Sequence, residues 1–446
     1  FGSSHCRPAA TPTLKGPAWP CSRLTMVDGQ PRHAARARPR AAPLLALLPA
    51  LSAATSGSEH LRPWQARFLD EYPLAVCNDG SPAAYYYRPG LGWSPRRWLV
   101  FLEGGGWCWN KESCRSAWAR RHSSSKSFPK TDKEVAIWSK RLSTGIFDIR
   151  RSPLADARVA YVRMCSNDAY MGDTSPPHAH WHFRGRRIIE AVLTDLRKRT
   201  GLGEQLGDLL VYGGCSSGAR GAMVSLDYVA STLAGKADVV GILDSALWVP
   251  VAPLGARTSF EEQTQGILKT ANATTFISEA CRASYPNHTW KCLFGAYRLP
   301  FITTPYLLSQ SQYDNFAIST SVHGYYDPKP DLSPPGLRWA ETYRQQVIRY
   351  LPSPASGSGK AIFSTACYMH CTISHPQAIA FRAGGTSLPE LLAKWLTAPS
   401  AAAATAKFRE ECRGFNCGGK LALNWKREAL AAARGLRDVA EPELFE

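Results

Sequence analysis

Short apolar runs recur along the chain and constrain its fold more than any other feature of the sequence. Six of them are typical of β-strands: 97–103, 158–164, 208–214, 238–244, 305–314 and 361–366. Amphipathic stretches with helical spacing lie between several of these runs, notably residues 186–199. Short apolar strands that alternate with helices are typical of a parallel sheet covered on both faces. We therefore expect an α/β fold in which helices flank a central, mostly parallel sheet.

The composition is sufficient for one large core. The chain has 446 residues, of which 44% are hydrophobic and 11% aromatic. Beyond residue 60 no linker is long enough to divide it, and the Pro-, Gly- and Ser-rich stretch 352–359 fits a surface loop. The tail, residues 388–446, is Ala-rich and predicts helices around one cysteine-bearing loop. We therefore expect a single domain over residues 58–446, preceded by an N-terminal extension over residues 1–57.

The N-terminal extension has the pattern of a secretory signal peptide. Four arginines between residues 32 and 40 precede the apolar run 41–54, which ends in small residues. A basic segment, a short apolar segment and small residues at the cleavage site define such signals. The apolar run is too short to span a bilayer. We therefore expect a secreted protein, extracellular or in a cell wall. A disordered Ala/Arg-rich tail or an organelle transit peptide is the alternative.

Cysteine usage indicates an oxidising compartment, because thirteen cysteines in one chain are typical of secreted, disulfide-bonded proteins. Three pairs are close in sequence: Cys108 with Cys114, Cys281 with Cys292, and Cys412 with Cys417. No C-x-x-C pair with matching histidines occurs, so we expect no metal site. Asn272 and Asn287 begin N-x-Thr sequons. The sequence thus predicts a glycoprotein with disulfide-bonded loops.

One apolar run ends in Gly-Cys-Ser-Ser-Gly at residues 214–218 and is followed by a helix-like segment, 219–233. A sharp strand-to-helix turn of this kind presents the central serine, Ser216, as a nucleophile, and the flanking glycines leave room for the turn. The helix N-terminus directs free N–H groups at developing negative charge. The five-letter pattern is common by chance, so the assignment depends on the strand before it and the helix after it.

A serine nucleophile needs a base, and the base needs an acid that orients it. In the α/β-hydrolase arrangement the chain order is Ser, then Asp or Glu, then His, on loops that follow different strands. Asp314 and His370 follow the last two strand-like runs and fit this order. Asp244 also ends a strand-like run, and His375 lies five residues beyond His370. Spacing favours His370 over His375 and leaves both alternatives open.

A Gly-rich turn supplies candidate oxyanion donors. Gly104, Gly105 and Gly106 follow the strand-like run that ends at Glu103. Backbone N–H groups in such a turn can approach a substrate closely, and the N–H of the residue after the nucleophile, here Ser217, usually completes the set. A plain tight turn is the alternative. All four pieces occur in the expected order, which favours a serine hydrolase.

Seven collinear blocks of the sequence resemble the pectin acetylesterase/Notum family. They are 77–87, 101–114, 165–173, 182–192, 213–221, 311–314 and 367–371. The resemblance extends from about residue 60 to about residue 420. It implies an α/β-hydrolase-like fold, secretion, disulfide bonds and a Ser-Asp-His triad that cleaves carboxylic esters without a cofactor. By this resemblance residues 58–446 form the catalytic domain.

The resemblance also implies which residues form the site. Asp244 and His375 become structural or pocket-lining residues, because the family's acid and base match other positions. The implied catalytic residues are Ser216, Asp314 and His370, and the implied oxyanion donors are the backbone N–H groups of Gly105, Gly106 and Ser217.

The motifs of the two branches of this family are mixed in the chain. Plant pectin acetylesterases read G-G-G-W-C, G-C-S-A-G and C-F-A-H-C, and this chain is similar at all three. Animal Notum, which removes palmitoleate from a signalling protein, is similar at C-N-D-G-S-P. Gly106 stands where Notum has a bulky aromatic beside its lipid pocket, and Ser217 stands where the family usually has Ala. We expect hydrolysis of O-acyl, most simply O-acetyl, esters on polysaccharide. Protein O-deacylation and non-catalytic glycan binding are the alternatives.

The net charge of +18 requires its own explanation. Two basic clusters occur: Arg115, Arg120, Arg121, Lys126, Lys130 and Lys133 follow the Gly-rich turn, and Arg184, Arg186 and Arg187 begin a helix-like stretch. Such clusters attract acidic polymers by long-range steering, which predicts an acidic glycan on a basic face. A solvated basic surface is the alternative. We expect no nucleic-acid partner, because no recognised binding motif accompanies the charge.

Overall fold

The structure is a computed structural model that describes residues 63–92, 96–174, 181–328, 332–378, 380–397 and 405–411. These residues belong to one compact unit that begins at His60. The predicted N-terminal extension and the predicted Cys412–Cys417 pair lie outside the described residues. The domain boundary at residue 58 stays a prediction.

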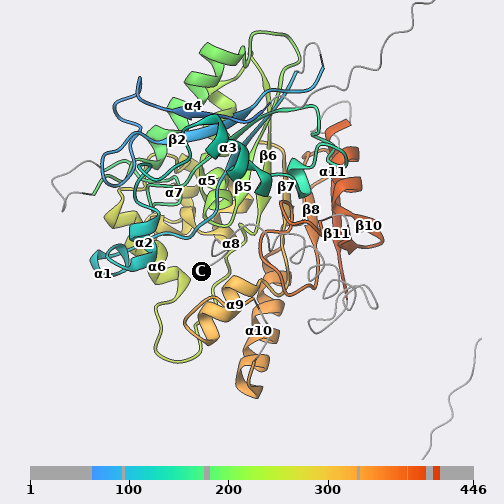
Figure 1. The fold of residues 1–446 in the computed structure, drawn as a ribbon. Coiled ribbons are helices and arrows are strands. Elements are labelled where there is room, and N and C mark those ends of the chain that lie inside the picture. Colours follow the sequence, from blue (N-terminus) through green and yellow to red (C-terminus); the bar gives the residue numbers. More distant parts are fainter. Residues whose placement is uncertain are drawn as a thin grey trace, which may run out of the picture. The chain divides into compact units, whose positions relative to one another are not determined.

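The described residues form a nine-stranded sheet with the order β1-β2-β4-β3-β5-β6-β7-β8-β11 (Figure 1). The strands are β1 (Gln65–Phe68), β2 (Ala84–Arg88), β3 (Arg97–Leu102), β4 (Arg158–Val162), β5 (Leu209–Cys215), β6 (Asp238–Asp244), β7 (Tyr306–Ser309), β8 (Ala361–Ser364) and β11 (Ala406–Arg409). The pairs β1–β2 and β2–β4 are antiparallel, and every pair from β4 to β11 is parallel. The expected mostly parallel sheet is confirmed.

The six predicted strand-like runs are β3 to β8, although β7 is shorter than its run. Three strands of the nine-stranded sheet were not expected. β1 and β2 are short and add to the antiparallel edge, and β11 lies in the tail for which the sequence predicts helices. The prediction is wrong there because β11 pairs in parallel with β8 and packs Phe408 against the core. The same tail does begin with a helix, α11 (Leu388–Thr397).

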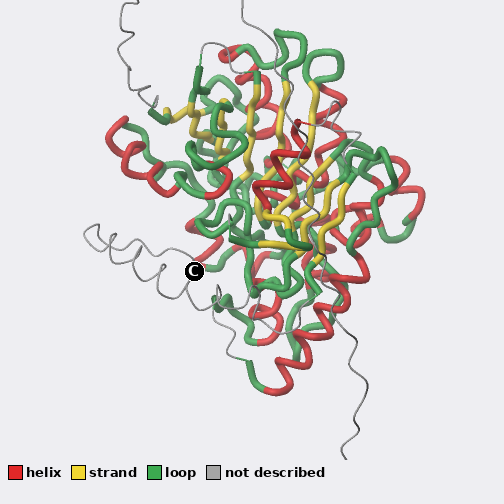
Figure 2. Tube along the Cα trace, turned by 90° about the vertical axis from the view of Figure 1, so that its right-hand side faces the viewer, coloured by secondary structure: helices red, strands yellow, loops and turns green. Residues whose placement is uncertain are grey.

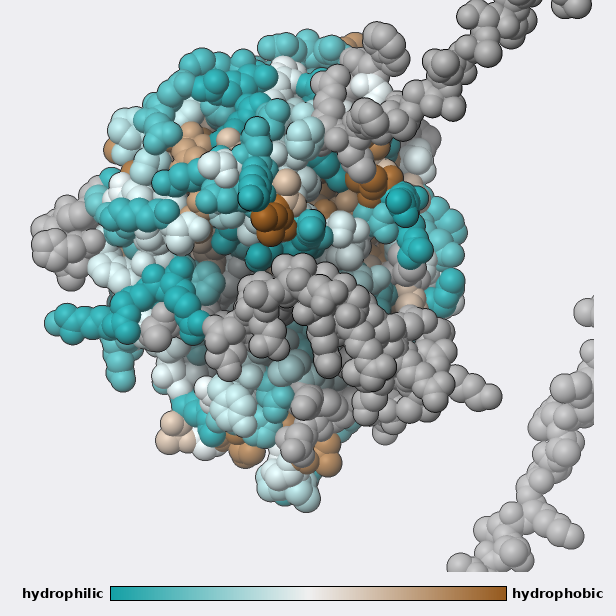
Figure 3. Space-filling model, in the orientation of Figure 1, coloured by the Kyte–Doolittle hydropathy of each residue, from teal (hydrophilic) through white to brown (hydrophobic). Residues whose placement is uncertain are grey.

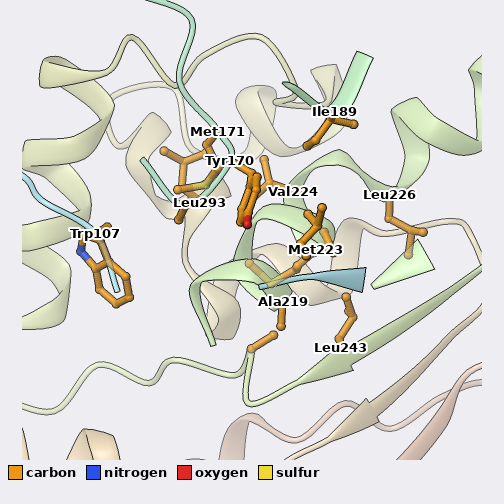
Figure 4. Packing of buried hydrophobic residues seen from close by; sticks show 14 of the residues in the cluster. Trp107, Tyr170, Met171, Ile189, Ala219, Met223, Val224, Leu226, Leu243 and Leu293 are labelled. Carbon is orange, nitrogen blue, oxygen red and sulfur yellow. The ribbon is translucent and has the colours of Figure 1, made fainter. Parts of the chain in front are cut away.

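Helices cover both faces of the sheet (Figure 2). α4 (Gly185–Thr200), α5 (Ser217–Thr232), α9 (Asn315–Val322) and α10 (Pro334–Tyr350) contribute to one core, and α3 (Asp132–Trp138) and α11 contribute to the other. Figure 4 shows Met223 and Val224 of α5 packed among side chains of the first core. Neighbouring residues of one strand enter opposite cores: Val100 of β3 belongs to the core to which α5 contributes, and Phe101 to the core to which α3 contributes. Burial on both faces explains why these strands read as continuous apolar runs.

The remaining elements are short. The helices are α1 (Lys111–Cys114), α2 (Ala117–Arg121), α6 (Phe260–Thr270), α7 (Glu279–Ser284) and α8 (Gly295–Arg298). The 3-10 helices are η1 (Ser139–Arg141), η2 (Gly145–Phe147), η3 (Thr289–Leu293) and η4 (Leu299–Phe301), and β9 (Arg382–Ala383) and β10 (Thr386–Ser387) form a separate hairpin. Among the described helices, none is long and apolar enough to cross a membrane.

The described part of the chain contains four disulfides: Cys77–Cys165, Cys108–Cys114, Cys215–Cys371 and Cys281–Cys292. Two of these, Cys108–Cys114 and Cys281–Cys292, are the pairs expected from sequence spacing. The other two join segments far apart in the chain, which spacing could not indicate.

Candidate active site

The loops that carry the predicted site residues leave the carboxyl ends of neighbouring parallel strands. Ser216 follows β5, Asp314 lies beyond β7, and His370 lies beyond β8. The Gly-rich turn follows β3, which pairs with β5. Because β3, β5, β6, β7 and β8 are neighbours in the sheet, these loops meet at one edge. Ligand sites of open α/β sheets lie at this edge.

Ser216 forms a sharp turn between β5 and α5. Its φ is 56° and its ψ is −124°, which lies in the left-handed half of conformational space. Its N–H donates to the carbonyl oxygen of Asp244 at 2.9 Å, and its own carbonyl accepts the N–H of Arg220 at 2.9 Å. A non-glycine residue held in such a conformation costs about 1–3 kcal/mol and is typical of functional sites. This is the geometry of a nucleophile elbow.

The glycines around Ser216 are required by close contacts with β3. A Cβ on Gly218 would overlap with the carbonyl oxygen of Leu102, and a Cβ on Gly214 would lie 2.5 Å from the same oxygen. A Cβ on Gly104 would lie 2.9 Å from the carbonyl oxygen of Cys215. The elbow therefore packs directly against the Gly-rich turn.

Asp314 and His370 are in contact. Nδ1 of His370 lies 2.7 Å from Oδ2 of Asp314, and the other oxygen of Asp314 accepts the N–H of Ala317 at 3.0 Å, which caps α9. The His370 side chain is 11% exposed and that of Asp314 is 3% exposed. Nε2 of His370 is buried and has no hydrogen-bond partner. A ring held at Nδ1 by a carboxylate keeps Nε2 available to accept a proton.

The loop that carries His370 lies against the elbow. The sulfur atoms of Cys215 and Cys371 and a ring nitrogen of His370 lie within 4.8 Å of one another. Ser216 Oγ and Nε2 of His370 form no hydrogen bond in this structure. This bond is often long in enzymes without bound substrate. The structure thus brings the three predicted residues to one place, and their catalytic roles stay a prediction.

Asp244 and His375, the alternatives that spacing left open, have other contacts. The Asp244 carboxylate accepts the N–H of Ile373 at 2.7 Å and the hydroxyl of Thr372 at 3.1 Å, and burial raises its pKa to about 6. Asp244 therefore anchors the chain just after His370. Nδ1 of His375 accepts the N–H of Gln377 at 3.2 Å, and burial lowers the pKa of His375 to about 4.

Met164 connects the two segments that carry the predicted oxyanion donors. A Cβ on Gly105 would overlap with Cε of Met164, and the Ser217 hydroxyl lies 3.5 Å from the Met164 sulfur. Gly105 and Gly106 have φ values of 150° and 74°, which favour glycine. The unusual hydroxyl of Ser217 is thus accommodated beside a thioether, and its backbone stays at the N-terminus of α5.

Glu103 holds the Gly-rich turn in place, a role that the sequence did not reveal. Its carboxylate accepts Nε–H of Arg163 at 2.7 Å, the N–H of Met164 at 2.9 Å and the hydroxyl of Tyr161 at 3.3 Å. These partners lie at the end of β4, the neighbour of β3. The only available signal was an acidic residue directly before three glycines.

Asp168 organises the segment 165–173 in the same way. Its fully buried carboxylate accepts the Ser166 hydroxyl at 2.6 Å and the N–H groups of Tyr170, Gly172 and Gly185 at 2.7–3.1 Å. Burial raises its pKa to about 6. The segment contacts α5, because a Cβ on Gly221 would overlap with the carbonyl oxygen of Ala169. The sequence of this block resembles the family, but it did not indicate the role of Asp168.

Aromatic side chains pack beside the candidate base. Phe316 stacks on the His370 ring at 5.3 Å between centroids, and Trp248 lies 6.3 Å from the same ring. Trp248 also packs against Trp107 at 5.2 Å and Phe260 at 4.7 Å. Trp107 is 5% exposed and Trp248 is 3% exposed. Buried aromatic rings therefore pack along this side of His370.

The two predicted basic clusters have different surroundings in the structure. Arg184, Arg186 and Arg187 all pair with Asp173, and the last two also pair with Glu190. Their charge is therefore largely offset. The cations between residues 115 and 133 are exposed, and Figure 3 shows hydrophilic side chains over α1 and α2 in this region.

A mostly parallel sheet with a serine elbow, an Asp–His pair and a Gly-rich turn at one edge is the arrangement of the α/β-hydrolase class. The model of the pectinacetylesterase family matches residues 64–406, and the chain belongs to this family. It is 29% identical to human palmitoleoyl-protein carboxylesterase NOTUM over 346 residues, which are 72% of this chain and 64% of that protein. It is 26% identical to pectin acetylesterase 11 of Arabidopsis thaliana over 313 residues, 67% of this chain and 76% of that one.

A solved structure agrees with this assignment. The Wnt deacylase Notum from Drosophila is similar with a TM-score of 0.67 and 25% identity, covering 79% of this chain and 97% of that one. The expected family and the α/β-hydrolase-like fold are confirmed. The chain spans about two thirds of the length of the human relative.

Proposed function

We propose that this chain is a secreted serine carboxylesterase that hydrolyses O-acyl esters, with acetyl groups on polysaccharide as its substrate class. The observation that carries the proposal is the 2.7 Å contact between Asp314 and His370 beside the Ser216 elbow, with Nε2 of His370 unpartnered. Membership of the pectinacetylesterase family supports the same reaction class.

The mechanism follows from these positions. His370 removes the proton of Ser216, whose oxygen attacks the ester carbonyl, while Asp314 keeps the imidazole in the required tautomer. The N–H groups of Gly105, Gly106 and Ser217 bind the developing oxyanion. His370 then donates its proton to the leaving alcohol, activates a water molecule for attack on the acyl-enzyme, and the acid is released. No step uses a cofactor.

The aromatic packing beside His370 supports a short acyl group. A lipid-sized cavity open to solvent would leave its lining accessible to water. Trp107, Trp248 and Phe260 are instead buried against one another, at most 9% exposed. An acetyl group needs less room beside these rings than a lipid chain does.

Protein O-deacylation is the second candidate within the class. The identity with the human palmitoleoyl-protein carboxylesterase, 29%, is slightly higher than that with the plant pectin acetylesterase, 26%. Non-catalytic glycan binding is the candidate outside the class, and the exposed cations between residues 115 and 133 support affinity for an acidic glycan.

Secretion is part of the proposal. Four disulfides fit an oxidising compartment. The predicted sequon residues Asn272 and Asn287 are both exposed and therefore accessible to glycosylation.

The test compares p-nitrophenyl acetate with p-nitrophenyl octanoate as substrates of the purified chain. We expect faster hydrolysis of the acetate, and Ser216→Ala should reduce kcat/KM by at least about 10³-fold, because the nucleophile is lost. Ser231→Ala, at an exposed position near the end of the same helix, is the matched control and should be fully active.

Three results would contradict parts of the proposal. Activity retained in Ser216→Ala would exclude the nucleophile. Preference for the octanoate would favour protein O-deacylation. No fluorophosphonate labelling of the folded wild type, together with retention on heparin, would favour a glycan-binding protein.

A further inference from the structure

One disulfide connects the residue before the candidate nucleophile with the residue after the candidate base. Cys215 is the last residue of β5 and precedes Ser216, and Cys371 follows His370. The two cysteines are 156 positions apart in the sequence and their Cα atoms are 5.5 Å apart. The bond therefore joins the two loops whose side chains must exchange a proton.

Hydrogen bonds attach the loop that carries His370, residues 367–373 and here called the base loop, to other strands. The N–H of Cys371 donates to the Ser245 hydroxyl at 3.0 Å, and that of Ile373 donates to Asp244 at 2.7 Å, both at the end of β6. The N–H of Met369 donates to the carbonyl of Tyr313, beyond β7, at 3.3 Å. Within the described part of the chain, no hydrogen bond joins residues 369–373 to β5. The disulfide is thus their direct bond to the strand that carries Ser216.

The elbow itself does not depend on this bond. Gly214 and Gly218 pack against the carbonyl of Leu102, and the Ser216 N–H is bonded to Asp244. Breaking the disulfide would leave the serine in place and release the base loop on the β5 side. The expected consequence is a loss of alignment between Ser216 and His370, without unfolding of either loop.

We propose that the Cys215–Cys371 disulfide is a positioning element of the active site, and that its reduction by a thiol reversibly lowers the esterase activity. The inference rests on the proposed function. Cys371 is partly exposed, whereas Cys215 is 5% exposed, so we expect an external thiol to attack the sulfur of Cys371. Attack by an external thiolate on that sulfur breaks the S–S bond and releases Cys215 as the thiolate.

The reaction balances with two equivalents of a monothiol or one dithiol. The first thiol forms a mixed disulfide with Cys371, and the second displaces it. Two electrons pass to the protein, which gains two cysteine thiols, and the reductant leaves as its disulfide. Oxidised glutathione reverses the sequence.

The expected effect is on kcat. A displacement of about 1 Å between reacting groups can cost 10²-fold, so reduction should lower kcat about 10- to 100-fold. KM should change little, because the aromatic side chains beside the base belong to other loops. This split separates positioning from loss of substrate binding.

The experiment measures kcat and KM for p-nitrophenyl acetate before and after treatment with dithiothreitol, then after reoxidation. A chelator is present, because two free thiols beside the His370 imidazole would otherwise form a soft-metal ligand set. Mass spectrometry after acid quenching identifies which cysteines are reduced, and the thermal midpoint verifies that the reduced protein remains folded.

Two variants separate this disulfide from the others. Cys215→Ala/Cys371→Ala should have the low kcat of the reduced wild type and should not respond to dithiothreitol. The matched control, Cys281→Ala/Cys292→Ala, removes a buried disulfide between α7 and η3 and should remain active and thiol-sensitive. Full activity of the wild type with Cys215 and Cys371 reduced would overturn the inference.

A second readout distinguishes this inference from the proposed function. Hydrogen exchange of residues 367–373 should accelerate on reduction in the wild type and not in Cys215→Ala/Cys371→Ala. If the oxidised protein hydrolyses no ester, the proposed function fails. Hydrogen exchange still tests whether the Cys215–Cys371 disulfide holds this loop in place. Equal protection of the loop in both redox states would show that it does not.

Discussion

At the scale of a single residue, the carboxylate of Asp168 holds the backbone beside the site in place. Its two oxygens accept four hydrogen bonds, two each, from groups in segment 165–173 and at the start of α4. Asn167, Ala169 and Tyr170, with φ of 48–58°, are held in the left-handed region around it. Such a conformation persists only where its surroundings enforce it.

At pH 8, where the Asp168 carboxylate is ionised, Asp168→Asn should therefore destabilise the fold. The amide NH2 replaces one acceptor oxygen and leaves two buried donors without a partner, which should cost about 2–4 kcal/mol. Asp238→Asn, at an exposed position of β6, is the matched control and should change stability by less than about 0.5 kcal/mol. Urea unfolding measures both. A difference between the variants below about 1 kcal/mol would contradict this role.

The sequence was sufficient for some of these residues and not for others, for a physical reason. Ser216, Asp314 and His370 each follow an apolar run, so a local pattern indicated where their side chains would emerge. Asp168 and Glu103 act on backbone N–H groups and on side chains that packing brings to them. Nothing in the local sequence records such partners.

The same limit applies at the scale of elements. The six buried strands were predictable because burial on both faces demands an apolar run. β11 was not, because it is a four-residue edge strand in an Ala-rich tail, and its pairing with β8 decides its conformation. Tertiary context overrides propensity in such short segments.

β11 also supports the two loops that carry the candidate acid and base. Beyond its last residue, Glu410 accepts the side-chain amide of Gln312 with its carbonyl at 2.7 Å. Its carboxylate accepts the N–H of Ala366 at 2.9 Å. Gln312 lies two residues before Asp314, and Ala366 lies four residues before His370. The edge strand therefore contributes to the geometry of the site from outside it.

Glu410→Ala tests this support. Loss of the carboxylate leaves the buried N–H of Ala366 without its acceptor, which should cost about 1–3 kcal/mol and lower kcat as well. Glu411→Ala is the adjacent control, because its side chain is 72% exposed and pairs only with Arg409 among the described residues. Unfolding curves and esterase assays of both variants give the comparison. Equal stability and equal kcat of the two variants would contradict a supporting role of β11 in the site.

At the scale of the whole molecule, three buried groups make stability depend on pH. Burial raises the pKa of Asp168 and of Asp244 to about 6, and it lowers the pKa of His375 to about 4. The ordinary values of these groups are 3.8 for Asp and 6.5 for His. Between pH 4 and 6 the folded state therefore holds protons on both aspartates, whereas the unfolded state holds one on the histidine.

This difference in bound protons sets the direction in which stability changes with pH. The aspartates contribute stability below their unfolded pKa, and that contribution is lost as the pH rises through about 6. His375 has the opposite effect, because its contribution is present above pH 6.5 and is lost as the pH falls toward about 4. Two groups outweigh one, so near pH 5 the folded state binds about one proton more. These three groups by themselves should then lower the free energy of unfolding by about 1 kcal/mol per pH unit as the pH rises.

His375→Gln isolates the opposing group. Without it the unfolded state loses nearly one bound proton near pH 5, so the fall in the free energy of unfolding should become steeper by about 1 kcal/mol per pH unit. His288→Gln, at an exposed position, leaves the sequon of Asn287 intact and should keep the wild-type slope. Urea unfolding at pH 4.5, 5, 5.5 and 6 measures all three proteins. If His375→Gln leaves the slope unchanged, this histidine is protonated in the folded state. Its burial then makes no contribution to the pH dependence of stability.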